Sequence, residues 1–108
     1  MTRFIQVVTT VDSKTAAESI AEALVDAHLA ACVQILGPIT SIYRWQGERE
    51  KAEEWLCLIK TDADSYGALA ESIREVHPYE VPEILAMDVV DGNPDYLLWM
   101  QEQLRTGR

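Results

Sequence analysis

The sequence predicts an α+β domain with a ferredoxin-like, split βαβ fold, in which two helices pack on one face of a four-stranded antiparallel sheet. Three observations lead to this fold class. The 108 residues are 48% hydrophobic, which fits a single compact domain. Four segments have the composition of strands, and two segments with helical periodicity separate the first strand from the second and the third from the fourth. We therefore expect the order βαββαβ plus a short C-terminal helix, with one domain over residues 1–105 and a tail at 106–108.

The first strand and the first helix are predicted by a change of periodicity near residue 12. Arg3 to Thr10 is rich in Val, Ile, Phe and Thr, as strands are. Asp12 or Ser13 then provides an N-terminal cap for a helix that we expect to end near Leu29. The apolar positions of this helix recur every three or four residues and are Ala17, Ile20, Ala21, Leu24, Val25 and His28.

A long hairpin is predicted in the middle of the chain. Ala31 to Trp45 contains two strand-like runs, and Gly37-Pro38 between them indicates a bulge or bend. Gln46 to Glu48 is the expected turn, and Glu50 to Thr61 is the expected returning strand. In the returning strand, one face carries Trp55, Cys57 and Ile59, and the other carries Leu56 and Leu58.

The last third of the chain predicts a helix, a strand and a second, shorter helix. Asp64 to Val76 has an apolar stripe, and His77-Pro78 ends this helix because proline disfavours helical geometry in the residue before it. Glu83 to Val90 is the expected fourth strand. Asn93-Pro94 provides an N-cap followed by a first-turn proline. The C-terminal helix that begins there runs through Tyr96, Leu97, Met100 and Leu104.

The two cysteines are predicted to lie too far apart to form a disulfide. A hairpin that turns at Gly47 sets Cys57 opposite a residue near Gly37, and Cys32 lies five residues further along, or roughly 17 Å. Both are expected to be small buried residues in a reducing compartment. No segment has the length of a membrane-spanning helix or the pattern of a signal peptide, so we expect a cytoplasmic protein.

Charge and residue types argue against several classes of function. Nine basic and eighteen acidic residues give a net charge of -9, which repels nucleic acids and anionic membranes. RNA-binding domains with the same element order need aromatic residues beside basic ones, whereas Trp55 follows Glu53 and Glu54. The acidic run from Glu48 to Glu54 is interpreted as a solvated hairpin tip. With two histidines and two cysteines, no catalytic arrangement is indicated, and we expect no enzyme.

The length of the hairpin predicts an assembly. Strands of about twelve residues extend ~40 Å, whereas a domain of this size has a diameter of ~26 Å. The hairpin must therefore project, with Tyr43 and Trp45 near its tip. The central part of the returning strand is apolar on both faces, yet two helices cover only one face of the sheet. Another copy of the chain is the expected cover for the second face.

Five segments of the sequence stand out together: LAACVQI (29–35), SIYRWQGE (41–48), EEWLCLIKT (53–61), HPYEVPEI (77–84) and DYLLWM (95–100). In their order and spacing they closely resemble the CutA divalent-cation tolerance proteins. The resemblance implies a ferredoxin-like fold assembled as a tight homotrimer, with an architecture similar to the PII signalling trimers and with the long hairpin in the trimer contacts. It also implies tolerance to copper and other divalent ions, with copper binding in some members.

The copper ligands that the resemblance implies are only partly present. Members with an assigned copper site use a cysteine at the end of the first strand and two adjacent histidines. Here the strand ends in Thr9 and Thr10, Val76 stands at the first histidine position, and only His77 matches. One imidazole is not a chelate, so copper or another divalent cation is expected to bind weakly and not to be needed for folding. The alternative is that His77 is a helix-terminal residue whose charge the helix dipole favours.

The segment after His77 has two interpretations. Its prolines make it a stiff connection, or its side chains form the wall of a cleft between subunits, with Tyr79 and Glu83 as candidate residues. Glu80 and Glu83 also offer oxygen ligands, which suit harder ions than copper(I). Lys60 either extends into solvent or adds a cationic group to the cleft. Three hypotheses remain: a non-enzymatic trimer of metal-ion response, a PII-like trimeric sensor of small molecules, and a purely structural trimer.

Overall fold

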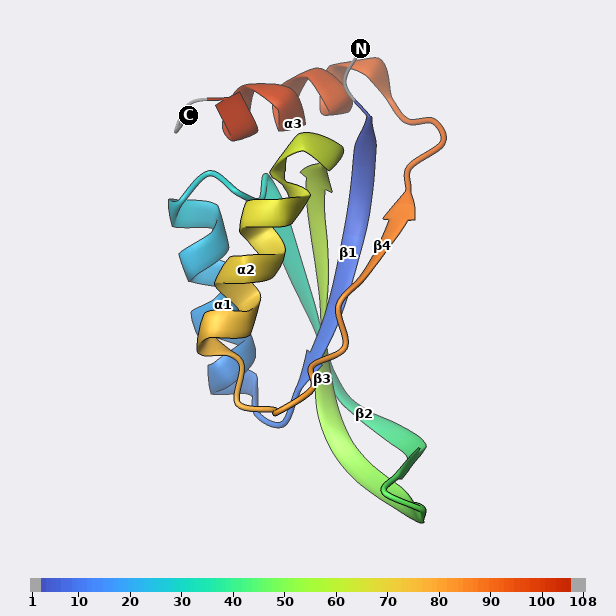
Figure 1. Ribbon diagram of the computed structural model, residues 1–108. Coiled ribbons are helices and arrows are strands. Elements are labelled where there is room, and N and C mark those ends of the chain that lie inside the picture. Colours follow the sequence, from blue (N-terminus) through green and yellow to red (C-terminus); the bar gives the residue numbers. More distant parts are fainter. Residues whose placement is uncertain (1–2, 106–108) are drawn as a thin grey trace.

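The fold is the predicted ferredoxin-like α+β arrangement, as the computed structural model shows for residues 3–105 (Figure 1). The four strands form one antiparallel sheet in the order β2-β3-β1-β4, with α1 and α2 on one face. The elements are β1 (Phe4–Val11), α1 (Lys14–Asp26), β2 (Cys32–Trp45), β3 (Glu48–Asp62), a 3-10 turn η1 (Ala63–Ser65), α2 (Tyr66–Val76), β4 (Leu85–Asp88) and α3 (Pro94–Arg105). The expected tail at 106–108 lies outside the described residues.

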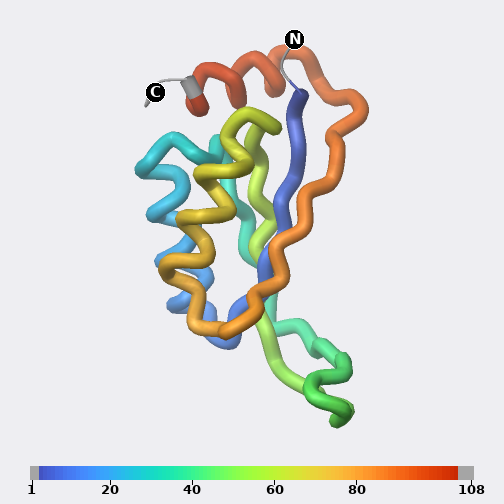
Figure 2. Tube along the Cα trace, viewed as in Figure 1, coloured from blue at the N-terminus to red at the C-terminus, as the bar shows by residue number. Residues whose placement is uncertain are grey.

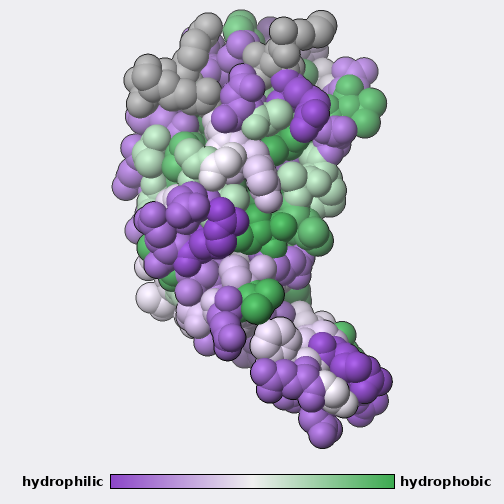
Figure 3. Space-filling model, in the orientation of Figure 1, coloured by the Kyte–Doolittle hydropathy of each residue, from purple (hydrophilic) through white to green (hydrophobic). Residues whose placement is uncertain are grey.

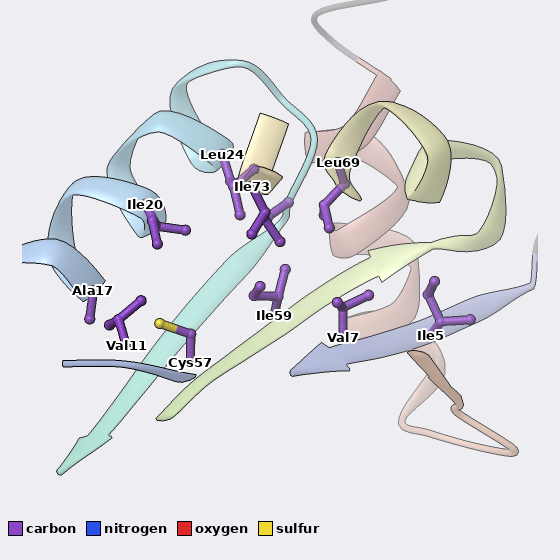
Figure 4. Close-up of a cluster of buried hydrophobic side chains, with 11 residues drawn as sticks. Ile5, Val7, Val11, Ala17, Ile20, Leu24, Cys57, Ile59, Leu69 and Ile73 are labelled. Carbon is purple, nitrogen blue, oxygen red and sulfur yellow. The ribbon is translucent and has the colours of Figure 1, made fainter. Parts of the chain in front are cut away.

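The hydrophobic core lies between the two helices and one face of β1 and β3 (Figure 4). Alternate residues of each strand point to this face, so Val7 pairs with Ile59 and both are fully buried. Burying each such side chain contributes roughly 1.5–3 kcal/mol. The buried members of this cluster are Ile5, Val7, Val11, Ala17, Ile20, Leu24, Ala30, Cys57, Ile59, Leu69 and Ile73.

Helix α1 begins as predicted and ends earlier than predicted. The Ser13 side chain accepts a hydrogen bond from the Ala16 backbone N–H at 3.1 Å, which confirms its capping role. At the other end, the helix stops at Asp26 because His28 adopts a left-handed backbone with φ 58°. The prediction that His28 belongs to the helical stripe is therefore wrong. Its ring Nδ1 lies 2.9 Å from the backbone oxygen of Gln103 in α3.

The β2–β3 hairpin projects beyond the body of the domain (Figures 1 and 2). The domain measures 44 × 25 × 22 Å along its principal axes, as the strand lengths predict. Gln46 and Gly47 both have positive φ, at 51° and 84°, and form a two-residue turn. This turn is one residue shorter than expected, so β3 begins at Glu48 rather than at Glu50.

The register of the hairpin differs from the expected one by two residues. A bulge lies between Leu36 and Ile39, at the predicted Gly37-Pro38 position, and together with the shorter turn it places Cys57 opposite Ile35. Cys32 lies three residues further along, which is roughly 10 Å. Both cysteines are free, as expected. Cys57 is buried as predicted, whereas Cys32 is only partly buried, so that part of the prediction is wrong.

The elements after β3 follow the predicted order with shifted ends. The Asp62 carboxylate accepts a hydrogen bond from the Ser65 N–H at 2.9 Å, and this caps η1, so that α2 starts at Tyr66. Strand β4 has four residues instead of the eight predicted, because it pairs only with Ile5–Val8 of β1 and residues 77–84 form a connector. Asn93 caps α3 by accepting from the Asp95 N–H at 3.2 Å.

The sheet face opposite α1 and α2 is largely uncovered. Helix α3 packs across one end of it, where Met100 and Leu104 bury against Ala31 and Phe4. The rest of this face carries apolar side chains that face away from the core. We call this set the open face; its exposed members are Leu36, Leu85 and Met87 and its half-buried members are Leu56 and Leu58.

Candidate functional site

His77 ties the start of the connector to the end of β1. It follows the last residue of α2, and its side chain is only 9% exposed. The ring Nε2 lies 2.8 Å from the Thr10 backbone oxygen, and Nδ1 accepts a hydrogen bond from the Tyr79 backbone N–H at 3.1 Å. Because an amide only donates, Nδ1 carries no proton, and the hydrogen on Nε2 is donated to Thr10. His77 is thus the C-cap residue of α2, where the alternative prediction placed it, and its ring joins the connector to β1.

Tyr79 and Glu54 form a hydrogen-bonded pair next to this histidine. The Tyr79 hydroxyl donates to Glu54 Oε2 at 2.7 Å, and Glu54, on β3, is only 5% exposed. The Tyr79 ring also meets the His77 ring edge-on, with centroids 4.8 Å apart. Burial raises the pKa of Tyr79 well above its usual value of 10.0, and the hydrogen bond and negative charge of Glu54 raise this pKa further. The hydroxyl thus stays protonated and remains a donor.

A cleft of about 620 Å³ lies between the connector and the hairpin. Three aromatic rings contribute to its walls, and every charged side chain that lines it is a glutamate. The cleft therefore combines apolar surface with negative charge. Its lining residues are Thr10 of β1, Ser41, Ile42, Tyr43 and Trp45 of β2, Glu54 of β3, and Tyr79, Glu80, Val81 and Glu83 of the connector.

Sequence comparison gives the family of the chain. The sequence model of the CutA1 divalent ion tolerance protein family matches residues 5–103. The chain belongs to this family. The match spans all eight helical and strand elements except the ends of β1 and α3, so the resemblance seen in the sequence is confirmed.

Individual CutA proteins match along most of the chain. The divalent-cation tolerance protein CutA of Thermus thermophilus is 48% identical over 96 residues, which cover 89% of this chain and 93% of that protein. Its solved structure has a TM-score of 0.91, with 46% identity and coverage of 93% and 97% of the two chains. Protein CutA of Mus musculus is 49% identical over 86 residues, and the match covers 80% of this chain and 49% of the mouse protein. The chain thus spans about half the length of that relative.

A solved structure of an archaeal CutA protein is also similar to this chain. The structure of the periplasmic divalent cation tolerance protein CutA from Archaeoglobus fulgidus has a TM-score of 0.90 and 33% identity. The match covers 97% of this chain and all of that one. The solved CutA structures of Thermus thermophilus and Archaeoglobus fulgidus are thus both similar to the fold described above.

The donor set at His77 does not fit the copper site that the family resemblance implies. Both ring nitrogens of His77 already make hydrogen bonds, so a metal ion would have to displace one of them. Thr9 is fully buried, and its hydroxyl is a poor substitute for a thiolate. Val76 supplies no donor. Among residues 3–105, no group of three or more His, Cys, Asp or Glu side chains is placed to hold a metal ion.

The other predicted site residues fall in two places. Tyr79 and Glu83 line the cleft together, and so do Tyr43 and Trp45, which the sequence assigned to trimer contacts. Lys60 is not among the residues that line it; its Nζ donates to Gln34 Oε1 on the neighbouring strand.

Glu54 is the site residue that the sequence analysis missed. It was included in the solvated acidic run of the hairpin, but it is buried and pairs with Tyr79. The two residues are 25 positions apart, and only the register of β3 against β1 and the path of the connector bring them together.

Helices long and apolar enough to cross a membrane do not occur within the described part of the chain.

Proposed function

We propose that this protein acts in tolerance to divalent cations as a non-enzymatic homotrimer. Membership of the CutA1 divalent ion tolerance protein family supports the role. The trimer is supported by the open face, which is the observation that carries the proposal. A trimer in which each hairpin reaches a neighbouring subunit is also consistent with the PII-like architecture that the resemblance implies.

The open face has the character of an interface. Leu36, Leu85 and Met87 are 48%, 57% and 45% exposed on one side of the sheet, and the half-buried Leu56 and Leu58 lie between them. Contiguous apolar surface of this kind is rare on a monomer and common where subunits meet. Charged substitution there is expected to prevent assembly without disturbing the core, because these side chains point away from it.

A matched pair of variants tests this proposal. Leu85→Glu places a charge on the open face, and Val76→Glu places one on an apolar side chain of α2 that is 55% exposed. Leu85→Glu is expected to reduce the mass in solution to that of one chain, while Val76→Glu leaves the assembly intact. Identical masses for the two variants and the wild type would contradict a role for the open face in assembly.

Copper binding is proposed to be weak. A divalent copper or zinc site needs several nitrogen or sulfur donors that converge, and His77 provides one imidazole that is already hydrogen-bonded. Calorimetric titration with copper is therefore expected to show weak binding that His77→Ala removes and His28→Ala does not.

We propose a cytoplasmic location, which the two free cysteines support.

The cleft favours a second candidate function, a PII-like sensor of small molecules. Its volume of about 620 Å³ falls within the range of small-molecule sites, and it has apolar walls with a few polar groups. In this role the trimer would bind a ligand at the cleft and pass the signal to a partner. Titration with a metal-free panel of metabolites tests it, and a saturable signal that Tyr79→Ala removes is the expected result.

A further inference from the structure

We propose that the cleft binds an organic cation, in which an ammonium or guanidinium group is carried on an aliphatic stem. The proposal gives a ligand class to the sensor role, on which it rests. Three features of the cleft support it: the sign of its charges, the state of its buried carboxylate and the aromatic rings beside it.

The charges of the cleft are uniformly negative. Glu54, Glu80 and Glu83 line it, and Arg and Lys are absent from its lining. Within the described residues, the ion pairs Arg3–Asp88 and Arg74–Glu71 lie elsewhere, and no described basic side chain pairs with Glu54. The cleft thus lacks a positive group of its own.

Glu54 is the most buried of these carboxylates and has no opposite charge beside it. It is 5% exposed, so most of its hydration is lost, and a buried carboxylate needs hydrogen bonds and an opposite charge to offset that loss. The Tyr79 hydroxyl supplies one hydrogen bond, to Oε2. The other oxygen, Oε1, remains for a donor that enters the cleft. A cationic N–H donor satisfies both requirements at once.

Aromatic rings face the same space. In a single chain, Tyr43 and Trp45 of the hairpin line the cleft and remain 45% and 41% exposed. The face of an aromatic ring attracts a cation by about 0.5–2 kcal/mol, with Trp the strongest. The same rings offer apolar contact to an aliphatic stem. An organic cation therefore gains from both the charges and the rings of the cleft, whereas a neutral molecule with the same stem gains only the apolar contact with the rings.

The arrangement favours an organic cation over a metal ion. The carboxylates of Glu54, Glu80 and Glu83 do not belong to a group placed to hold one metal ion, in the part of the chain that is described. Carboxylates that are spread along a cleft of about 620 Å³ suit a ligand with separated amino groups. We therefore expect diamines to bind more tightly than monoamines.

Calorimetric titration of the purified full chain tests the ligand class with four probes of similar size. The probes are 1,4-diaminobutane, butylamine, 1,4-butanediol and succinate, in metal-free buffer of low ionic strength. Diaminobutane is expected to bind most tightly, butylamine less tightly, and the diol and the dianion not at all. Added salt should weaken binding of the amines, because charge attraction is screened. Equal binding of diol and diamine, or no binding of either amine, would overturn the proposal.

Two variants and one control locate the site. Glu54→Gln keeps the shape of the side chain and is expected to weaken diaminobutane binding at least tenfold. Trp45→Leu, at an exposed position outside the hydrophobic core, should weaken diaminobutane binding three- to tenfold. This second variant tests the site even if Glu54→Gln does not fold. Glu22→Gln, on the exposed side of α1, should leave the affinity unchanged. Binding that survives both cleft variants would place the amine elsewhere and overturn the proposal.

The mass of each sample separates this proposal from the trimer. A protein that has the mass of a trimer and binds no amine overturns the cation site and supports the trimer. This outcome includes the case in which a basic side chain of a second copy fills the cleft. A single chain that binds diaminobutane in a Glu54-dependent way overturns the trimer and supports the site.

Discussion

Replacing Tyr79 with phenylalanine removes the hydroxyl that donates to Glu54 at 2.7 Å and leaves the ring against His77. Hydrogen bonds to charged groups contribute roughly 1.5–3 kcal/mol, and an unpaired buried acceptor costs a similar amount. Tyr79 is half-buried, so water can replace part of the lost bond. We therefore expect Tyr79→Phe to lower the free energy of unfolding by about 1–2 kcal/mol.

Urea unfolding at one fixed chain concentration measures this change, because the stability of an oligomer depends on concentration. Tyr43→Phe is the matched control: its ring lines the same cleft, and none of the hydrogen bonds of the described residues involves its hydroxyl. Its effect should stay within about 0.5 kcal/mol. In a Glu54→Gln background the Tyr79→Phe effect should shrink, since the two residues are coupled. Equal effects of Tyr79→Phe and Tyr43→Phe would refute the reasoning.

Three further predictions concern the hairpin, a buried thiol and copper. A Cβ on Gly37 would overlap the Trp55 ring, so Gly37→Ala should destabilise by about 1–3 kcal/mol. Gly67→Ala, in open space on α2, should be neutral or stabilise by up to about 1 kcal/mol. Thermal unfolding compares the two variants. Burial raises the pKa of the Cys57 thiol from 9.0 to about 11. The unfolded chain therefore loses this proton first, so the free energy of unfolding should be constant below pH 9 and fall between pH 9 and pH 11. The same fall in a Cys57→Ala variant would contradict this cause. Thr9→Cys should bind copper more tightly than the wild type in calorimetry, and equal affinities would speak against the missing thiolate as the cause.

The elements of the fold could be predicted because each has a local signal. The helical stripe of α1, the alternation in β3 and the Asn93-Pro94 start of α3 depend on residues close together in the chain. The early end of α1 has no such signal, since a histidine with positive φ is uncommon and its sequence does not announce it. The short β4 likewise depends on where the connector crosses, which is a property of the tertiary structure.

The candidate site could be predicted only in part, because some of its residues have a local signal and others are brought together by the tertiary structure. The segment 77–84 is conspicuous for its prolines, aromatic ring and carboxylates, so Tyr79 and Glu83 were found from the sequence alone. The partners of this segment were not. His77 meets Thr10 across 67 positions and Tyr79 meets Glu54 across 25, and both contacts depend on the path that the connector takes past β1 and β3. A glutamate in an acidic run gives no local sign that it will be buried.

Light scattering of the purified wild-type protein tests the trimer most directly. At micromolar chain concentration we predict a mass of about 37 kDa, three times the 12.2 kDa of one chain. A well-folded species of 12.2 kDa that persists at this concentration would contradict the account, because the open face would then be stable in water without a partner.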